Sequence, residues 1–249
     1  MLLKSQDVRE FYVAFNTLTT NRLESSATGR LIIYGIMNEW DLQAALTDRW
    51  LLESPNFAPL GKLELVAWEL MFPSWDINYK TTRWNEPSLD FVFLSQSDSF
   101  VLVELKNLIP NRSSFLSAFC QVSHRAVQFA DSFSKERLLK AFNFCMTGAC
   151  HRTCADADAT KALSERLKRL PNSVTKDRIY RVLAAIDFPK EHLALLEQFN
   201  GLSHSELSDV IGIPPKSAKE RLRFSTMKGA DYDPLRTHPA SLYTVTFEK

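Results

Sequence analysis

Three charged side chains lie in two neighbouring apolar segments, where together they could form a cation site. Asp90 lies within the apolar residues 87–94, and Glu104 and Lys106 end the apolar residues 100–106. Alternate side chains of a β-strand share a face, so Glu104 and Lys106 are expected to point the same way. Charges at the end of a buried strand are costly unless they are paired or hold a metal ion. Asp90 on the preceding strand would complete such a site.

A β-hairpin is the element that would position these three residues. The apolar segments are separated by the polar residues 95–99, which is typical of a turn between paired strands. Asp90 would then lie on the strand next to Glu104. The alternative is an ordinary hairpin, in which Glu104 and Lys106 form a surface ion pair worth about 0 to 1 kcal/mol.

An acid on one strand, a turn, and an acid-X-lysine triplet on the next strand resemble the motif of the PD-(D/E)XK nuclease superfamily. The matching residues are Asp90, Glu104 and Lys106. The sequence departs from the motif at Pro87, which is followed by two further residues before the aspartate. The resemblance covers about residues 39–148.

Two further residues extend the resemblance. Superfamily members usually supply another acid from the helix that precedes the sheet, and Glu39 resembles it, with Glu69 as the rival candidate. Recombination-type members often carry a glutamine on the helix after the acidic strands, followed by a tyrosine one turn later. Gln121 is similar to that glutamine, but His124 or Arg125 stands in place of the tyrosine. The alternative for Gln121 is an ordinary polar residue on a helix surface.

The resemblance implies a divalent-metal-dependent nuclease that hydrolyses DNA phosphodiester bonds, acting as an endonuclease in restriction, repair, recombination, or mobile-element and defence processes. Asp90, Glu104 and the backbone carbonyl of Leu105, aided by Glu39, would hold Mg²⁺ or Mn²⁺ through oxygen ligands. Lys106 would orient or help to deprotonate the attacking water and stabilise the transition state. The alternative is a non-cleaving DNA-binding or assembly protein, because the same fold also occurs in proteins that grip nucleic acid without cutting it.

The expected element order fits an α/β fold with a mixed central sheet flanked by helices, which is the αβββαβ restriction-endonuclease-like core. Residues 1–187 would form this domain with an N-terminal extension, and residues 188–249 a mainly helical C-terminal region. Residues 61–72 fit either a helix or a strand. The expected helices are 39–52, with Asn38 as N-cap, 114–133 and 156–170; the expected strands are 77–84, 89–94, 100–106, 141–146 and 179–186.

Residues 202–222 resemble a helix-turn-helix. Ser203 and Glu206 have the spacing of a capping box, and Gly212 would provide the turn before a basic second helix. The alternative is a helical subdomain that packs on the core or makes a dimer contact. The candidate nucleic-acid-binding residues of the second helix are Lys216, Lys219, Arg221 and Arg223.

Charge is divided unevenly along a chain whose net charge is only +1. Residues 1–125 carry 11 Lys and Arg against 14 Asp and Glu, whereas residues 126–249 carry 19 against 15. Bases of the second half could contact a phosphate backbone, and a solvated helix face is the alternative for each group. A first group of these bases comprises Lys161, Arg166, Lys168, Arg169, Lys176, Arg178 and Arg181.

Composition excludes several other classes of protein. With 45% hydrophobic and 24% charged residues, the chain is ordinary for a globular protein, and no apolar run approaches the ~20 residues of a membrane helix. The early charges argue against a secretory signal, so a cytoplasmic location without membrane contact is expected. DNA is the expected partner, with a homodimer or a larger nucleoprotein complex as possible assemblies. The sequence contains no glycine-rich phosphate-binding loop, so it does not indicate an ATPase or a dinucleotide enzyme.

The four cysteines are expected to be structural free thiols in a reducing compartment. The alternatives are a zinc site or an iron–sulfur cluster, but no C-x-x-C pair occurs in the sequence. The cysteines are Cys120, Cys145, Cys150 and Cys154.

Overall fold

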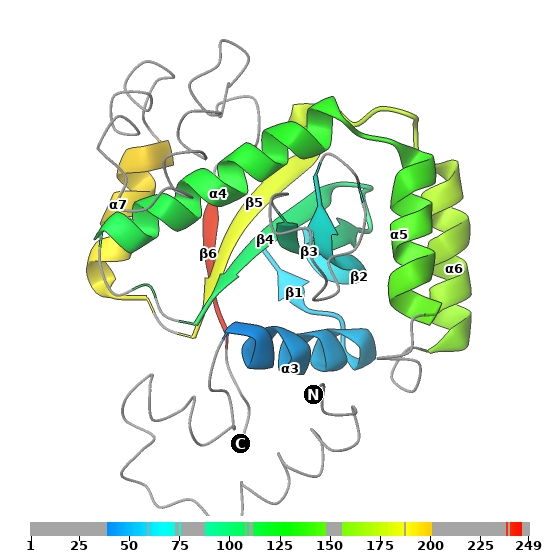
Figure 1. The fold of residues 1–249 in the computed structure, drawn as a ribbon, viewed down its shortest axis with the longest axis horizontal. Coiled ribbons are helices and arrows are strands. Elements are labelled where there is room, and N and C mark those ends of the chain that lie inside the picture. The colour runs from blue at the N-terminus through cyan, green and yellow to red at the C-terminus, as the bar shows by residue number, and fades with distance from the viewer. Residues whose placement is uncertain are drawn as a thin grey trace, which may run out of the picture.

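The computed structural model shows a mixed α/β fold in which helices surround a curled six-stranded sheet (Figure 1). The expectation of an α/β fold with a mixed sheet flanked by helices is therefore confirmed. The expected strand 77–84 and the helix-turn-helix-like residues 202–222 lie outside the described part of the chain. The structure describes residues 39–58, 60–72, 75, 88–107, 109, 112–147, 156–186, 188–200, 238 and 240–245.

Strand order in the sheet follows the order of the chain, from β1 to β6. Strands β1 to β4 pair antiparallel with one another, whereas β5 runs parallel to β4 and β6 runs parallel to β5. β6 comes from the C-terminal region and joins the same sheet as the strands of the hairpin. The strands are β1 Asn56–Phe57, β2 Gly61–Met71, β3 Ser88–Ser95, β4 Phe100–Lys106, β5 Ile179–Ala185 and β6 Ser241–Thr244.

Helices flank this sheet, and three of them agree closely with the sequence expectations. The N-cap of α6 is Asp156, whose side chain accepts a hydrogen bond from the backbone N–H of Ala159 at 2.9 Å. The expected helices 39–52, 114–133 and 156–170 are confirmed as α3, α4 and α6, with ends that differ by no more than two residues. The helices are α3 Glu39–Leu52, α4 Arg112–Asp131, α5 Lys135–Thr147, α6 Ala157–Arg169 and α7 Lys190–Asn200, with a short 3₁₀ turn at Lys176–Arg178.

Among the strands, the hairpin 89–94 and 100–106 is confirmed as β3 and β4, and 179–186 as β5. The undecided segment 61–72 forms the long strand β2. The expected strand 141–146 is wrong, because these residues lie within α5. Buried and exposed residues alternate there in the pattern of a helix face, since Phe142 and Cys145 are buried while Asn143 and Phe144 are exposed.

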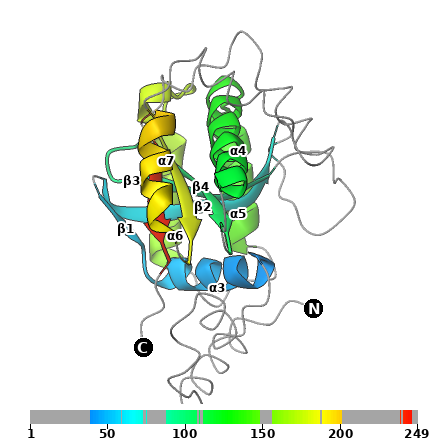
Figure 2. The ribbon, with the colours of Figure 1, turned by 90° about the vertical axis from the view of Figure 1, so that its left-hand side faces the viewer.

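Helices α3 and α4 pack against aromatic rings on opposite faces of the β3–β4 hairpin. Trp50 of α3 makes edge contacts with Phe91 and Phe93, with ring centroids 4.8 and 5.2 Å apart. Phe129 of α4 instead contacts Phe100 at 5.0 Å. Phe93 pairs with Val101, so the neighbouring Phe100 must face the other side. Figure 2 shows α7 beside α4 and α3 crossing below them.

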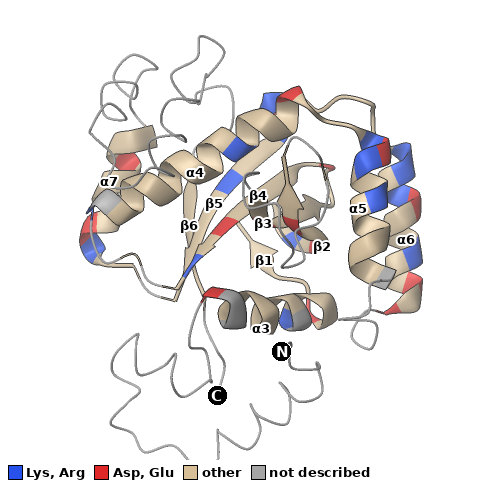
Figure 3. Ribbon diagram, in the orientation of Figure 1, with Lys and Arg blue, Asp and Glu red and all other residues tan. Residues whose placement is uncertain are grey.

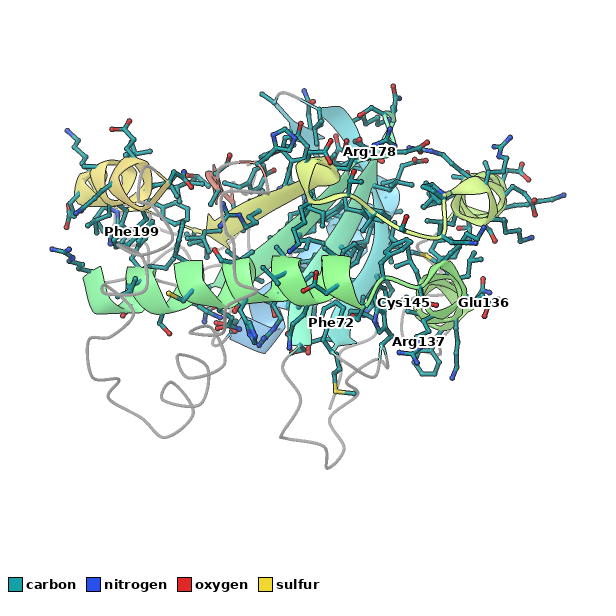
Figure 4. The ribbon with its side chains drawn as sticks, turned by 90° about the horizontal axis from the view of Figure 1, so that it is seen from above. Phe72, Glu136, Arg137, Cys145, Arg178 and Phe199 are labelled. Atoms are coloured by element: carbon teal, nitrogen blue, oxygen red, sulfur yellow. The ribbon has the colours of Figure 1, made fainter. Side chains whose placement is uncertain are left out.

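Helices α5 and α6 form a separate pair beside β2 (Figure 1). Cys145 of α5 is buried against the sheet, with its sulfur 3.9 Å from the carbonyl oxygen of Trp68, whereas Glu136 and Arg137 point away from the sheet (Figure 4). Burial raises the pKa of the Cys120 and Cys145 thiols to about 12. Both are free and unreactive in character, as expected; Cys150 and Cys154 lie outside the described residues.

Buried His192 on α7 is expected to make the protein sensitive to acid. Its ring lies 4.8 Å from that of Phe115, and neither ring nitrogen has a hydrogen-bond partner among the described residues. Burial lowers the pKa of His192, although Glu191 opposes this effect. Since the unfolded state then takes up the proton more readily, stability is lost as the pH falls through the ordinary histidine range.

Between pH 7.5 and 5, we expect the unfolding free energy of His192→Leu to fall less than that of the wild type, as measured by urea unfolding. The exposed Glu197→Gln on the same helix is the control, and it should follow the wild type. Equal losses in His192→Leu and the wild type would contradict this expectation.

Candidate functional site

Strands β2, β3 and β4 each place a buried acid at the same level of the sheet. Glu69 of β2 stands opposite Asp90 of β3, because its two neighbours in the chain pair with the two neighbours of Asp90. Glu104 of β4 follows directly after the pair between Phe91 and Val103, which ends the β3–β4 ladder, so it lies next to Asp90. Glu69 and Asp90 are each 7% exposed, and Glu104 is fully buried. Register therefore gathers three carboxyl groups in the interior.

Lys106 supplies positive charge to this acidic cluster. Its Nζ donates to Oε1 of Glu104 at 2.7 Å and to Oε1 of Glu39 at 3.2 Å. Glu39 is the first residue of α3, so the ammonium group links β4 to the start of that helix. Burial works against the charge of Lys106, but the carboxyl groups of Glu104, Asp90 and Glu39 outweigh it and raise the pKa of the lysine. Lys106 is therefore charged at neutral pH.

Asp90 lies where the two hairpin strands separate. Its Oδ2 accepts a hydrogen bond from the backbone N–H of Leu105 at 2.6 Å, in place of a further ladder hydrogen bond. Burial raises the pKa of Asp90 well above its ordinary value, and the charge of Glu104 adds to this, whereas Lys106 opposes it. The carboxyl group of Asp90 therefore ionises less readily than an exposed aspartate, and a bound cation would favour its ionisation.

Glu69 has an unusual backbone and a defined partner. Its φ of 50° lies in the left-handed region, which residues other than glycine rarely adopt and which recurs at functional sites. Nε2 of Gln43, on α3, donates to Oε1 of Glu69 at 2.6 Å and to the carbonyl oxygen of Asp90 at 3.3 Å. Burial raises the pKa of Glu69 to about 7; hydrogen bonds from Gln43 and Ser88 oppose the shift.

One oxygen of this cluster is unpaired within the described part of the chain. Oε2 of Glu104 is buried without a hydrogen bond among the described residues, which is costly for a carboxylate. Carboxylate oxygens are the ligands that Mg²⁺ and Mn²⁺ prefer, so the donor set fits such a cation. Within the described part of the chain, however, no three acidic, histidine or cysteine groups are arranged ready to hold a metal ion. The carboxylates would have to turn toward it.

The structure brings together Asp90, Glu104, Lys106 and Glu39, the four residues that the resemblance places at one site. It also brings Glu69 into the cluster, so both candidates for the additional acid are present. Glu69 is on a strand and not on the helix. Lys216, Lys219, Arg221 and Arg223 lie outside the described residues.

Gln121 lies on α4 and is buried, with an exposed fraction of 9%. Arg125, which follows it by one turn, is also buried and donates from Nε to the carbonyl oxygen of Ser88 at 3.1 Å. Ser88 begins β3, two residues before Asp90. The arginine at the expected tyrosine position thus ties α4 to the strand that carries Asp90. For Gln121, burial argues against the alternative of a residue on an exposed helix surface.

Gln43 is the site residue that sequence reasoning missed. It follows Glu39 by four residues, so the two side chains share one face of α3. That spacing is the signal that could have revealed it: an acid and an amide one turn apart, at the start of the helix that precedes the sheet.

Several candidate phosphate contacts are already engaged within the protein. Arg181 is buried and donates to the hydroxyl of Ser123 at 2.6 Å, so it stabilises the fold and is not available to DNA. Arg166 binds Asp98, Glu64 and the carbonyl oxygen of Ser95. Figure 3 shows basic residues along α5 and α6 interspersed with acidic ones. Lys168 pairs with Glu165 at 2.6 Å and Lys176 with Asp131 at 3.4 Å.

Comparison of this chain with protein-family models, curated proteins and solved structures finds no match. None of the described helices has the length and apolar character needed to cross a bilayer. The chemistry of the acidic cluster therefore carries the functional inference.

Proposed function

We propose that this protein is a divalent-metal-dependent nuclease of the PD-(D/E)XK type, which cuts DNA within the strand. The observation that carries this proposal is the fully buried Glu104 carboxylate next to Asp90. One of its oxygens contacts Lys106, and the other has no partner among the described residues. Such a carboxylate is well suited to a cation and poorly suited to a purely structural role.

The arrangement of the elements supports the same proposal. The elements α3, β2, β3, β4, α4 and β5 follow the αβββαβ order of a restriction-endonuclease-like core, with the short strand β1 added before β2 and the two helices α5 and α6 added before β5. β3 carries Asp90, β4 carries Glu104 and Lys106, and α3 carries Glu39. These residues therefore lie on the elements to which the resemblance assigns them.

In this mechanism, Asp90, Glu104 and the backbone carbonyl of Leu105 would hold Mg²⁺ or Mn²⁺. When bound, the cation would lower the pKa of a bound water and neutralise charge on the scissile phosphate. Lys106 is charged and would orient the attacking water and stabilise the negative charge that develops on the phosphate. Glu39 holds Lys106 from the helix, which limits the positions that the ammonium group can adopt.

Cutting is favoured over binding alone by the presence of all three motif residues in one buried cluster. A protein that only binds DNA needs exposed Lys and Arg side chains. Internal carboxylates would not help it, because they repel phosphate. In the first group of bases, Arg166 and Arg181 are held in internal contacts. The described residues thus offer more support for a catalytic site than for a simple binding surface.

The direct test is cleavage of supercoiled plasmid, linear duplex and single-stranded circular DNA by the purified full chain. With Mg²⁺ or Mn²⁺ we expect nicked or linear products from at least one substrate, and with EDTA we expect none. If DNA is shifted on a gel but never cut with either metal, the protein is a non-cleaving DNA-binding protein. If it neither cuts nor shifts DNA, both functions are excluded for these substrates.

A further inference from the structure

We propose, on the basis of the metal-dependent function above, that Glu69 is the third carboxylate ligand of the cation site and that Gln43 is its positioning residue. Glu39, the acid on the helix, would instead hold Lys106. The two candidate acids thus have different tasks, which their contacts distinguish.

Glu39 is engaged with the cation that the protein already contains. Its Oε1 lies 3.2 Å from Nζ of Lys106, and its side chain is 43% exposed at the start of α3. Unlike the fully buried Glu104, Glu39 is open to solvent, so its charge does not need a metal ion to balance it. Because Glu39 lies on the solvent side of Lys106, it is well placed to orient that lysine.

Glu69 lies in the interior beside the other two acids. It stands level with Asp90 across the β2–β3 ladder, and the charge of Glu104 acts on it directly. Like charges that are buried together repel one another, so these acids must either keep protons or share a cation. Oε2 of Glu104 lies in the same cluster, buried and without a hydrogen bond among the residues that the structure describes, which independently supports a cation there.

The left-handed backbone at Glu69 gives a further reason to assign this residue to the cation site. A residue with a side chain in this conformation costs of order 1 to 3 kcal/mol and persists only where the surroundings enforce it. Two buried neighbours in β2, Trp68 and Leu70, keep their regular pairing with β3 on either side. The irregularity is therefore confined to the residue that carries the carboxylate.

Gln43 fixes this carboxylate relative to β3. Its amide nitrogen has two N–H groups, and it donates to Glu69 Oε1 and to the backbone oxygen of Asp90. The glutamine is itself buried, with an exposed fraction of 6%. Because one amide contacts both acid-bearing strands, its loss should disturb the cation site without removing any ligand.

Isothermal titration with Mn²⁺ at pH 8 tests this division of tasks without relying on cleavage. We expect Glu69→Gln to weaken Mn²⁺ binding by about tenfold or more, and Gln43→Met, which keeps the side-chain size, by about tenfold. Glu39→Gln should weaken it by less than about threefold, since it removes no ligand. The exposed Glu197→Gln makes the same change of charge on α7 and should bind as the wild type does.

Thermal unfolding of each metal-free variant at pH 5 shows whether it is folded. If Glu69→Gln does not fold, Gln43→Met carries the test. Unchanged Mn²⁺ affinity in the folded variants, or a larger loss in Glu39→Gln than in Glu69→Gln, would overturn the role of Glu69 and leave the nuclease proposal standing. A wild-type protein that binds no Mn²⁺ would overturn both.

Discussion

Lys106→Ala is expected to slow DNA cleavage by about 100-fold or more while the protein still folds in the presence of Mn²⁺. The ammonium group is charged and lies 2.7 Å from Glu104, beside the acids that would hold the cation. Loss of one preorganised group that stabilises transition-state charge typically costs about 100- to 1,000-fold in rate. Since the substitution also leaves Glu104 without its ammonium partner, the metal-free variant should be less stable than the wild type. Single-turnover cleavage and thermal unfolding with and without Mn²⁺ measure the two effects.

The matched control is Lys62→Ala, which removes an exposed lysine from β2. It should cut DNA at the wild-type rate. Asp90→Asn should resemble Lys106→Ala in cleavage, but should also lose Mn²⁺ affinity, since it removes a ligand. Normal cleavage by folded Lys106→Ala would exclude the proposed role of the lysine.

The unfolding free energy of the metal-free protein is expected to fall as the pH rises from about 5 to 8, because of the acidic cluster. Burial raises the pKa of Glu69 from 4.5 to about 7 and raises that of Asp90 as well. The folded state therefore keeps protons that the unfolded state releases, so unfolding becomes more favourable as the pH rises through this window. For Glu69, a shift of this size corresponds to roughly 3 kcal/mol, at about 1.4 kcal/mol per pKa unit.

Urea unfolding in EDTA at several pH values measures this effect. Glu69→Gln cannot ionise, so its unfolding free energy should fall less than that of the wild type between pH 5 and 8. The variant should be the more stable of the two at pH 8. Buried His192 acts in the opposite direction at the acid end, but it is common to both proteins and cancels in the comparison. Parallel curves for the two proteins would show that Glu69 is ionised normally in the folded state.

The hairpin and its three charges were predictable from sequence, because alternation along a strand and a polar turn are local signals. The segment 141–146 was not, because a short apolar run does not distinguish a buried strand from one face of a helix. Its true state depends on packing against β2, which lies far away in the chain.

The site could be predicted only as far as local pattern reaches. Asp90, Glu104 and Lys106 form a recognisable motif, but the place of Glu69 depends on the register between β2 and β3 and on a left-handed residue. The local sequence around Glu69 predicts neither the register nor the left-handed conformation. The burial of Arg181 is also a tertiary effect, since its partners Ser123 and His238 lie more than fifty residues away on either side.

Helix α3 contacts strand β3 through both of its halves. Near its start, Gln43 binds the backbone of Asp90, and near its end, Trp50 packs on Phe91 and Phe93. The aromatic packing thus sets the distance and angle at which the helix presents its polar end. Fold stability and site geometry are consequently not separable traits in this chain. A substitution at Trp50 that never touches an acid would alter the site, and a screen for inactive variants would return core positions of α3 together with its polar ones.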